Sequence, residues 1–321
     1  MMEGLTVETD LLQRFEEGLN PARLGESIIP ASVLGYGEIS TVIEIPALAG
    51  LACKRMPMFR DEAEAQRYEA LYQEYIDVLE NSVGLHLPPS RIVRLVRKNR
   101  VVLYILQEKL PAVTIGNQAI HYLSPADVNK LVWAVLAEAR KVFDFNRRNR
   151  GQLEIGLDNQ ISNWSIVGFD PARPTLEETP QLLYFDTSAP LLRKEGVEQQ
   201  NPELFLRSAP SFLRWIIRWL FLDDVMTRYY DFRKVTIDLI ANFYKEQRPE
   251  LVPGLVESAN RFFSAAGEPN VELIREAEVE SYYREDATTW RVYLAFRRLD
   301  RGLSRFLGKE YPYILPGPIK R

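Results

Sequence analysis

The residues best suited to chemistry lie between Gly156 and Asn163, a segment that reads GLDNQISN. Asp158 and Asn163 stand here between two short apolar runs, and a second acid, Asp186, follows another apolar run. A carboxylate and a carboxamide at strand ends, with a further carboxylate nearby, can supply the base and the oxygen ligands for Mg²⁺ that phosphoryl transfer needs. Taken alone, the same residues also suit an ordinary polar turn.

A glycine-rich segment and a lysine precede this region. Gly35, Gly37 and Ser40 follow the pattern Gly-x-Gly-x-x-Ser among β-favouring residues. Glycines let the backbone turn tightly and bring its amide groups close to phosphate oxygens, although a plain hairpin turn has the same pattern. A β-rich run follows the glycines instead of a helix, which excludes a Rossmann phosphate loop. Lys54 in the next apolar run could face a polyphosphate or lie exposed at a sheet edge.

The bulk properties favour an intracellular globular protein. The chain has 321 residues, enough for one large domain or two lobes, and a net charge of -4 that gives no support to nucleic-acid binding. The single cysteine, Cys53, excludes an internal disulfide framework, so we expect a reducing, cytoplasmic setting. Residues 1–20 lack the features of a signal peptide, and charges interrupt the apolar segment 212–225, so we expect no membrane span.

The hydrophobic patterns predict an α+β fold in three parts. Residues 1–30 form a helical extension, 31–110 a mainly β lobe that carries one long helix at 61–81, and 111–321 a helical lobe. Ser124 and Pro125 predict the start of a helix that runs to about residue 146. Further amphipathic helices are expected at 211–222 and 225–247.

The order of these signals resembles the bilobal protein-kinase-like fold, and more specifically its small-molecule branch, the aminoglycoside and choline phosphotransferases. The series consists of a glycine-rich hairpin, a strand lysine, a helix with acids, two strands, a hinge, a long helix, the Asp-x-x-x-x-Asn motif and a strand that ends in Asp. The resemblance covers roughly residues 31–190.

The resemblance implies roles for particular residues in binding ATP and Mg²⁺. Asp158 would be the catalytic base, and Asn163 and Asp186 the metal ligands. Lys54 would contact the nucleotide phosphates and pair with a glutamate of the following helix. The remaining implied residues belong to the phosphate loop, to that helix and to the hinge that holds adenine: Gly35, Gly37, Ser40, Glu64, Glu69, Glu74, Glu108 and Leu110.

The sequence departs from the family in ways that leave more than one function open. Gly156 occupies the position of the family's catalytic-loop histidine, and no Ala-Pro-Glu segment follows Asp186. The first expectation is therefore a phosphotransferase that acts on a small hydroxyl- or amine-bearing molecule. The alternatives are an inactive pseudokinase that serves as a binding or regulatory module, and a nucleotidyl transferase.

Overall fold

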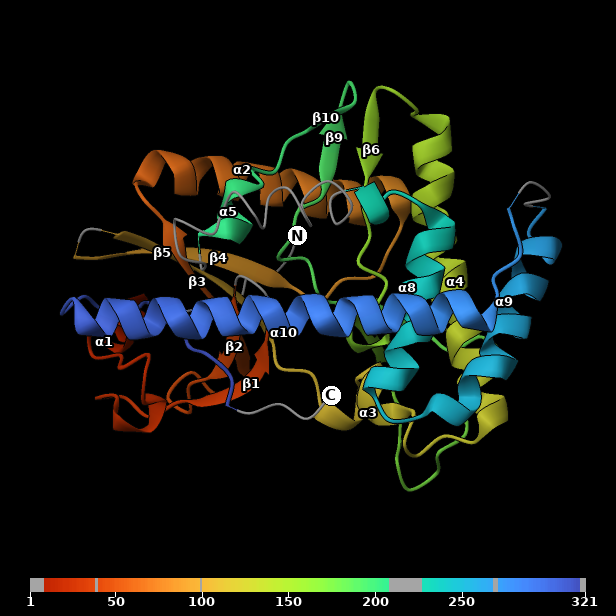
Figure 1. Ribbon diagram of the computed structural model, residues 1–321, viewed down its shortest axis with the longest axis horizontal. Coiled ribbons are helices and arrows are strands. Elements are labelled where there is room, and N and C mark those ends of the chain that lie inside the picture. Colours follow the sequence, from red (N-terminus) through yellow and green to blue (C-terminus); the bar gives the residue numbers. More distant parts are fainter. Residues whose placement is uncertain (1–8, 38–39, 99, 208–226, 268–270, 318–321) are drawn as a thin grey trace.

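The computed structural model describes residues 9–37, 40–98, 100–207, 227–267 and 271–317 (Figure 1). The helix expected at 211–222 lies outside these residues. The strands are β1 (Ser32–Tyr36), β2 (Thr41–Glu44), β3 (Leu51–Phe59), β4 (Ser90–Arg97), β5 (Arg100–Glu108), β6 (Leu153–Ile155), β7 (Trp164–Ile166), β8 (Leu182–Tyr184), β9 (Leu192–Lys194) and β10 (Val197–Glu198). The α-helices are α1 (Thr9–Glu17), α2 (Glu62–Asp77), α3 (Gly116–Ala119), α4 (Pro125–Arg148), α5 (Glu203–Leu206), α8 (Phe232–Lys245), α9 (Val252–Ala265) and α10 (Glu276–Phe306). The short helical turns are η1 (Leu24–Glu26), η2 (Val78–Val83), η3 (Ala112–Thr114), η4 (Ile161–Asn163) and η7 (Pro249–Leu251).

The first half of the chain forms an antiparallel five-stranded sheet in the order β1-β2-β3-β5-β4. Side chains alternate between the two faces of each strand. In β3, Cys53 and Arg55 therefore point toward α1, where Cys53 is buried and Arg55 bonds Glu16. Lys54 and Met56 point to the opposite face, where Met56 packs among residues of α2. The register of β3 thus decides that Lys54 faces the rest of the molecule.

Helix α2 covers the inner face of this sheet (Figure 1). Its N-cap is Asp61, whose side chain accepts a hydrogen bond from the amide of Glu64 at 2.8 Å. The helix continues through the π-helical turn η2 to Val83, and its C-cap is Gly84, whose φ of 82° suits glycine. The helix predicted over 61–81 is confirmed, with its end at Val83.

The second half of the chain is mainly helical. Ser124 caps α4 by accepting from the amide of Asp127, with Pro125 at the first helical position, as predicted. Helices α4, α8 and α9 pack together around the largest hydrophobic core and lie to the right of the sheet in Figure 1. Two small sheets, β7-β8 and β10-β9-β6, lie beside these helices. The connections between their strands contain Asp158, Asn163 and Asp186. The α+β class with a small antiparallel sheet is confirmed.

Both ends of the described chain return to the five-stranded sheet. Helix α1 packs on its outer face, and residues 311–315 insert into the clusters on both of its faces. Helix α10 runs across the whole molecule from α8 to the sheet (Figure 1). Near its far end, the Arg297 guanidinium lies 5.2 Å from the ring centroid of Tyr313. The five-stranded sheet and the helical half of the fold are therefore linked by the chain segment that follows β5 and again by α10. Among the described residues, no helix is both long and apolar enough to cross a membrane.

Candidate functional site

Lys54 and Asp186, 132 residues apart in sequence, meet in an ion pair at 2.6 Å between Nζ and Oδ1. Ser188 completes a triangle, because its hydroxyl accepts from Lys54 at 3.0 Å and donates to Asp186 at 3.0 Å. The Lys54 side chain is 12% exposed and that of Asp186 34%, so the pair lies at the edge of the interior. The alternative of an exposed edge lysine is thereby excluded.

The charge of Asp186 is stabilised by these contacts. Burial by itself would raise the pKa of this carboxyl group, but the charge of Lys54 and the hydrogen bonds from Lys54 and Ser188 outweigh it. The pKa of Asp186 therefore lies below its usual range, and the group is a carboxylate at neutral pH.

Asp158 and Asn163 belong to one compact loop that lies against this pair. The Asn163 side-chain amide donates to the carbonyl oxygen of Asp158 at 3.0 Å, and the carbonyl of Asn163 accepts from the amide of Phe185 at 3.1 Å. Trp164 pairs with Tyr184 in the β7-β8 ribbon, so Asn163 and Asp186 lie at the same end of it. The loop also has the turn geometry of the alternative interpretation, since Asp158 Oδ1 accepts from the amide of Gln160 at 3.4 Å.

The Asp158 and Asp186 carboxylates both lie close enough to the buried phenol of Tyr184 for their charges to affect its pKa. Burial raises the pKa of Tyr184 well above its usual value, and the negative charges of Asp158 and Asp186 raise it further. The structure therefore brings together Lys54, Asp158, Asn163 and Asp186, which the sequence separates by up to 132 residues.

Close backbone packing fixes the loop from two sides. Gly116, the first residue of α3, lies so near η4 that a Cβ at this position would collide with the carbonyl oxygen of Ile161. On the other side, the amide of Leu157 donates to the carbonyl of Tyr229 at 2.9 Å. Inside the loop, buried Asn159 accepts a hydrogen bond from the Trp164 indole at 3.1 Å.

Gly156 has no room for the histidine that the resemblance to kinase-like proteins implies at this position. A Cβ on Gly156 would lie 2.9 Å from Cβ of Leu191 and 3.1 Å from Cβ of Tyr229. Its φ lies outside the left-handed region, so the constraint is space and not backbone conformation. The packing of this loop therefore favours glycine at position 156 over any residue with a side chain.

The expected pairing of Lys54 with a helix glutamate does not occur, which corrects the roles given to Glu64, Glu69 and Glu74. Glu64 is held by Arg207, whose Nη2 donates to it at 2.6 Å. Glu69 pairs with Arg94 at 3.2 Å, and Glu74 with Lys194 at 2.7 Å. The physical reason is the register of α2, which turns its acidic residues toward other basic partners and a row of tyrosines toward the site.

That row of tyrosines is the part of the site that sequence reasoning missed. The spacing of Tyr68, Tyr72 and Tyr75 indicates a buried helix face, and all three are buried. Their hydroxyls nevertheless bond to the two segments that carry Asp158 and Asp186. The only signal in the sequence is that the buried face is rich in tyrosine, which usually needs a hydrogen-bond partner when buried.

The glycine-rich segment forms part of the β1–β2 hairpin, and residues 108–110 connect the five-stranded sheet to the helical half of the chain. Gly35 lies in β1 opposite Val42, and the amide of Gly37 donates to the carbonyl of Ser40 at 3.0 Å, which closes the turn. Glu108 ends β5 and Leu110 follows it, where the chain passes from the sheet to the helices. Contact of these residues with a nucleotide stays a prediction.

The donor set suits a hard cation that is bound together with a phosphate. Asp186 Oδ1 is used by Lys54 and Ser188, and the Asn163 nitrogen is used by Asp158. The Asp186 carboxylate and the Asn163 carboxamide carry oxygens, the donors that Mg²⁺ prefers. No group of three or more acidic, histidine or cysteine residues forms a metal cluster within the described parts of the chain. Mg²⁺ commonly uses only one or two protein carboxylates, so a small donor set of this kind is compatible with Mg²⁺.

Comparison with known proteins identifies the family of this chain but gives no activity for it. One family model matches residues 23–303. The chain belongs to DUF6206, a family of unknown function. No curated protein matches it. The function of this DUF6206 chain therefore has to follow from its own geometry.

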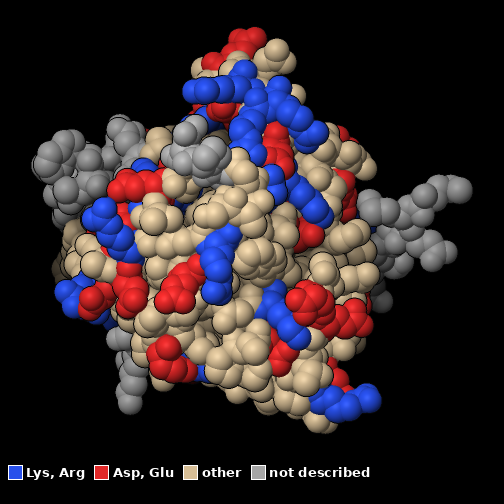
Figure 2. All heavy atoms as spheres, turned by 90° about the vertical axis from the view of Figure 1, so that its right-hand side faces the viewer, with Lys and Arg blue, Asp and Glu red and all other residues tan. Residues whose placement is uncertain are grey.

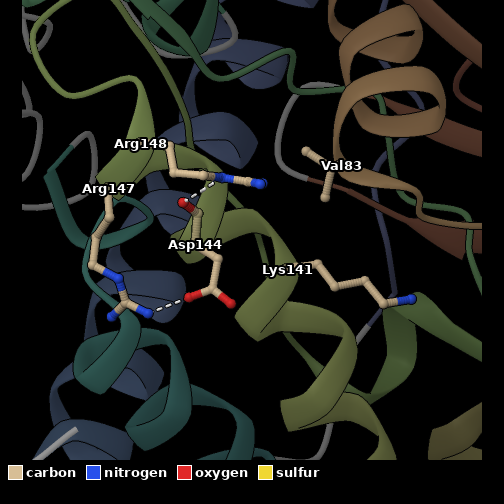
Figure 3. A pocket seen from close by; sticks show the side chains of 5 residues that line it. All are labelled: Val83, Lys141, Asp144, Arg147 and Arg148. Atoms are coloured by element: carbon tan, nitrogen blue, oxygen red, sulfur yellow. Dashed lines mark hydrogen bonds and ion pairs between the residues drawn. The ribbon is translucent and has the colours of Figure 1, made fainter. Parts of the chain in front are cut away.

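A pocket of about 450 Å³ lies elsewhere on this DUF6206 protein, between the end of α4 and η2 (Figure 3). Its lining consists of Val83, Lys141, Asp144, Arg147 and Arg148, none of which belongs to the candidate site. Figure 2 shows Lys and Arg side chains gathered at the top of the helical face, the end at which α4 and β6 lie in Figure 1. Of the residues that line the pocket, Arg147 pairs with Asp144, and Lys141 pairs with Glu138.

Helix α8 connects the candidate loop to a buried acid. Lys245 at the end of α8 donates to the Gln160 side chain at 3.4 Å. Further along the same helix, Asp238 is buried. Burial and the nearby charge of Asp286 raise the pKa of Asp238 to about 6, although Arg228, Tyr282 and Lys245 oppose the shift. In the folded protein this carboxyl group therefore holds its proton to a higher pH than in the unfolded chain.

The raised pKa of Asp238 predicts a specific pH dependence of stability. Between about pH 4 and about pH 6 the folded protein binds a proton that the unfolded chain has released, so this group's contribution to the free energy of unfolding falls as pH rises. The total loss is about 3 kcal/mol at most. Urea unfolding of the wild type should give a free energy of unfolding that falls with rising pH across this window. Asp238→Asn should remove the part of this pH dependence that comes from Asp238. The exposed Glu177→Gln serves as the control, and an unchanged slope in Asp238→Asn would contradict the assignment.

Proposed function

We propose that this protein is an ATP- and Mg²⁺-dependent phosphotransferase that acts on a small hydroxyl- or amine-bearing molecule. The observation that carries the proposal is the ion pair between Lys54 and Asp186, beside a loop that contains Asp158 and Asn163. The strand order β1-β2-β3-β5-β4, with α2 inserted between β3 and β4, supports a protein-kinase-like arrangement of these residues.

Each residue has a distinct part in the proposed reaction. Asp158 accepts the proton of the attacking hydroxyl or amine group. Lys54 holds nucleotide phosphate oxygens, and Asn163 and Asp186 hold Mg²⁺, which supplies charge neutralisation at the transferred phosphoryl group. The glycine-rich hairpin at Gly35, Gly37 and Ser40 covers the phosphates, and the backbone of 108–110 holds the base. Because phosphoryl transfer depends mainly on positioning and electrostatics, these few groups suffice for the chemistry.

A catalytically inactive binding module is the second candidate, and two observations favour it. Gly156 leaves no space for a histidine in the loop, and Lys54 has its ion pair with Asp186 in place of a helix glutamate. Nucleotide phosphates would compete with these contacts, because Lys54 Nζ already donates to Asp186 Oδ1 and to the Ser188 hydroxyl.

Binding and turnover separate these functions. Thermal-shift titration with ATP and Mg²⁺ should raise Tm for the wild type, and Asp186→Asn should remove the Mg²⁺-dependent part of this rise. Phosphate transfer to a panel of small alcohols and amines should fall by about 10²-fold or more in Asp158→Asn. Asp170→Asn, a partly exposed acid in the loop between β7 and β8, is the matched control.

Each alternative predicts a different outcome of the same assay. Nucleotide binding without any product supports the inactive module. Mass spectrometry of a product that carries AMP in place of phosphate supports nucleotidyl transfer. Turnover that is unchanged in both Asp158→Asn and Asp186→Asn would rule out the proposed site.

A further inference from the structure

Three tyrosines of α2 reach both segments of the candidate site. The Tyr68 hydroxyl donates to the carbonyl of Ser188 at 2.7 Å. The Tyr72 hydroxyl lies 3.2 Å from the Thr187 hydroxyl, and the Tyr75 hydroxyl donates to the carbonyl of Gly156 at 3.0 Å. Two contacts therefore fall just after Asp186, and the third falls two residues before Asp158.

The spacing of the three residues explains how one helix makes all three contacts. Positions 68, 72 and 75 lie on the same face of a helix, and their rings are buried against the sheet and the helical core. A buried phenol holds its hydroxyl at a fixed distance from the helix axis, because its ring has only two side-chain torsions to lose. The three tyrosines therefore hold both loops at a fixed distance from α2.

Tyr72 also connects this row of tyrosines to the five-stranded sheet. Its hydroxyl lies 2.9 Å from that of Ser90 in β4, and Gln107 of β5 donates to the carbonyl of Phe185 at 3.2 Å. The segment 185–188 is thus held by α2, by β5 and by Lys54 of β3. Glu64, Glu69 and Glu74 of α2 do not contribute to this arrangement, since each pairs with a basic residue elsewhere.

We propose that Tyr68, Tyr72 and Tyr75 are positioning residues, which set Asp186 and the Asp158 loop in place for Mg²⁺ and nucleotide. In the observed orientation of α2, the tyrosine hydroxyls connect this helix to the two loops, whereas a lysine–glutamate pair would have required its glutamates to face the site. The effect on metal and nucleotide rests on the proposed function, whereas the effect on the two loops does not.

Hydrogen–deuterium exchange of the full chain without ligand tests the positioning itself. Tyr68→Phe, Tyr72→Phe and the triple Tyr→Phe variant retain the rings and lose the hydroxyls. Exchange in peptides that cover 185–188 should speed up in each variant, and the triple variant should also show faster exchange in 156–163. Tyr122→Phe, an exposed tyrosine after α3, is the matched control. Exchange that matches the wild type in all three variants would overturn the proposal, whatever the protein does with nucleotide.

The Mg²⁺ dependence separates positioning from general stability. At a temperature well below Tm, the Mg²⁺ concentration for half-maximal ATP response should rise about three- to tenfold in Tyr68→Phe, with a smaller change in the ATP requirement at saturating Mg²⁺. A merely structural role would lower Tm and leave this concentration unchanged, which would overturn the proposal. The proposal would also fail if Glu69→Gln weakened the Mg²⁺ response while the tyrosine variants did not. A wild-type protein that shows no response to ATP and Mg²⁺ would remove the proposed function, and the exchange result would still decide the role of the tyrosines in holding the loops.

Discussion

Replacing Gly156 by histidine, the residue that the kinase-like family has here, should destabilise the protein and not improve its catalysis. The new side chain would begin with a Cβ 2.9 Å from Cβ of Leu191 and 3.1 Å from Cβ of Tyr229. Both neighbours are Cβ atoms close to the backbone, so they cannot move aside as the end of a flexible chain can. Gly156→Ala should lower the free energy of unfolding by about 1–3 kcal/mol, and Gly156→His should lower it further.

A second glycine provides the matched control for this series. Gly254 lies in α9, and a Cβ on it would meet nothing within 4 Å. Gly254→Ala should therefore be neutral or stabilise the protein by up to about 1 kcal/mol. Denaturant unfolding of the three variants measures the difference. A Gly156→His protein as stable as the wild type would show that the loop can open, and would weaken the steric explanation of the missing histidine.

Replacing Glu16 by alanine should destabilise the protein strongly, by about 3–5 kcal/mol. Glu16 is fully buried and accepts two hydrogen bonds from Arg55, each 2.7 Å long, and one from Arg97 at 3.2 Å. The Tyr104 hydroxyl also donates to it. Its loss would leave the buried Arg55 without its counter-ion, and an uncompensated buried charge is costly.

The network around Glu16 also joins both ends of the described chain to the sheet. Arg55 donates to the carbonyl of Pro312 at 2.6 Å, and Arg97 pairs with Glu310 at 2.8 Å. Glu16→Ala should therefore loosen α1 and residues 310–315 together, which limited proteolysis can detect. The exposed neighbour Glu17 is the control, because its replacement by alanine should change stability by only about 0.5 kcal/mol. A loss in Glu16→Ala no larger than in Glu17→Ala would contradict the assigned role of the network.

The pKa of Glu16 gives this network a pH signature. Burial would raise the pKa of this carboxyl group, but Arg55, Tyr104 and Arg97 more than offset burial, so the pKa lies below its usual value. Stability from Glu16 is therefore present above the pKa of the unfolded chain and is lost as pH falls through the lower folded value. The direction is opposite to that of Asp238, whose contribution declines as pH rises.

Several features of the fold and of the site follow from local sequence alone. The N-caps Asp61 and Ser124, the helices that follow them and the paired strands β4 and β5 all have signals within a few residues. The order of Lys54, Asp158, Asn163 and Asp186 along the chain is also a property of the sequence. This order predicts which groups could act together, because oxygen donors and a lysine in this order are typical of one kind of chemistry.

Only the tertiary structure decided which of these groups meet. The register of β3 turns Lys54 inward to Asp186, and the rotation of α2 presents Tyr68, Tyr72 and Tyr75 to the site while its glutamates pair with Arg207, Arg94 and Lys194. Local sequence cannot determine these choices, because a tyrosine stripe and an acidic stripe both satisfy helical periodicity. The contacts that choose between them come from residues 18 to 143 positions away. The crowding at Gly156 by Leu191 and Tyr229 has the same origin, since both neighbours approach it from other segments of the chain.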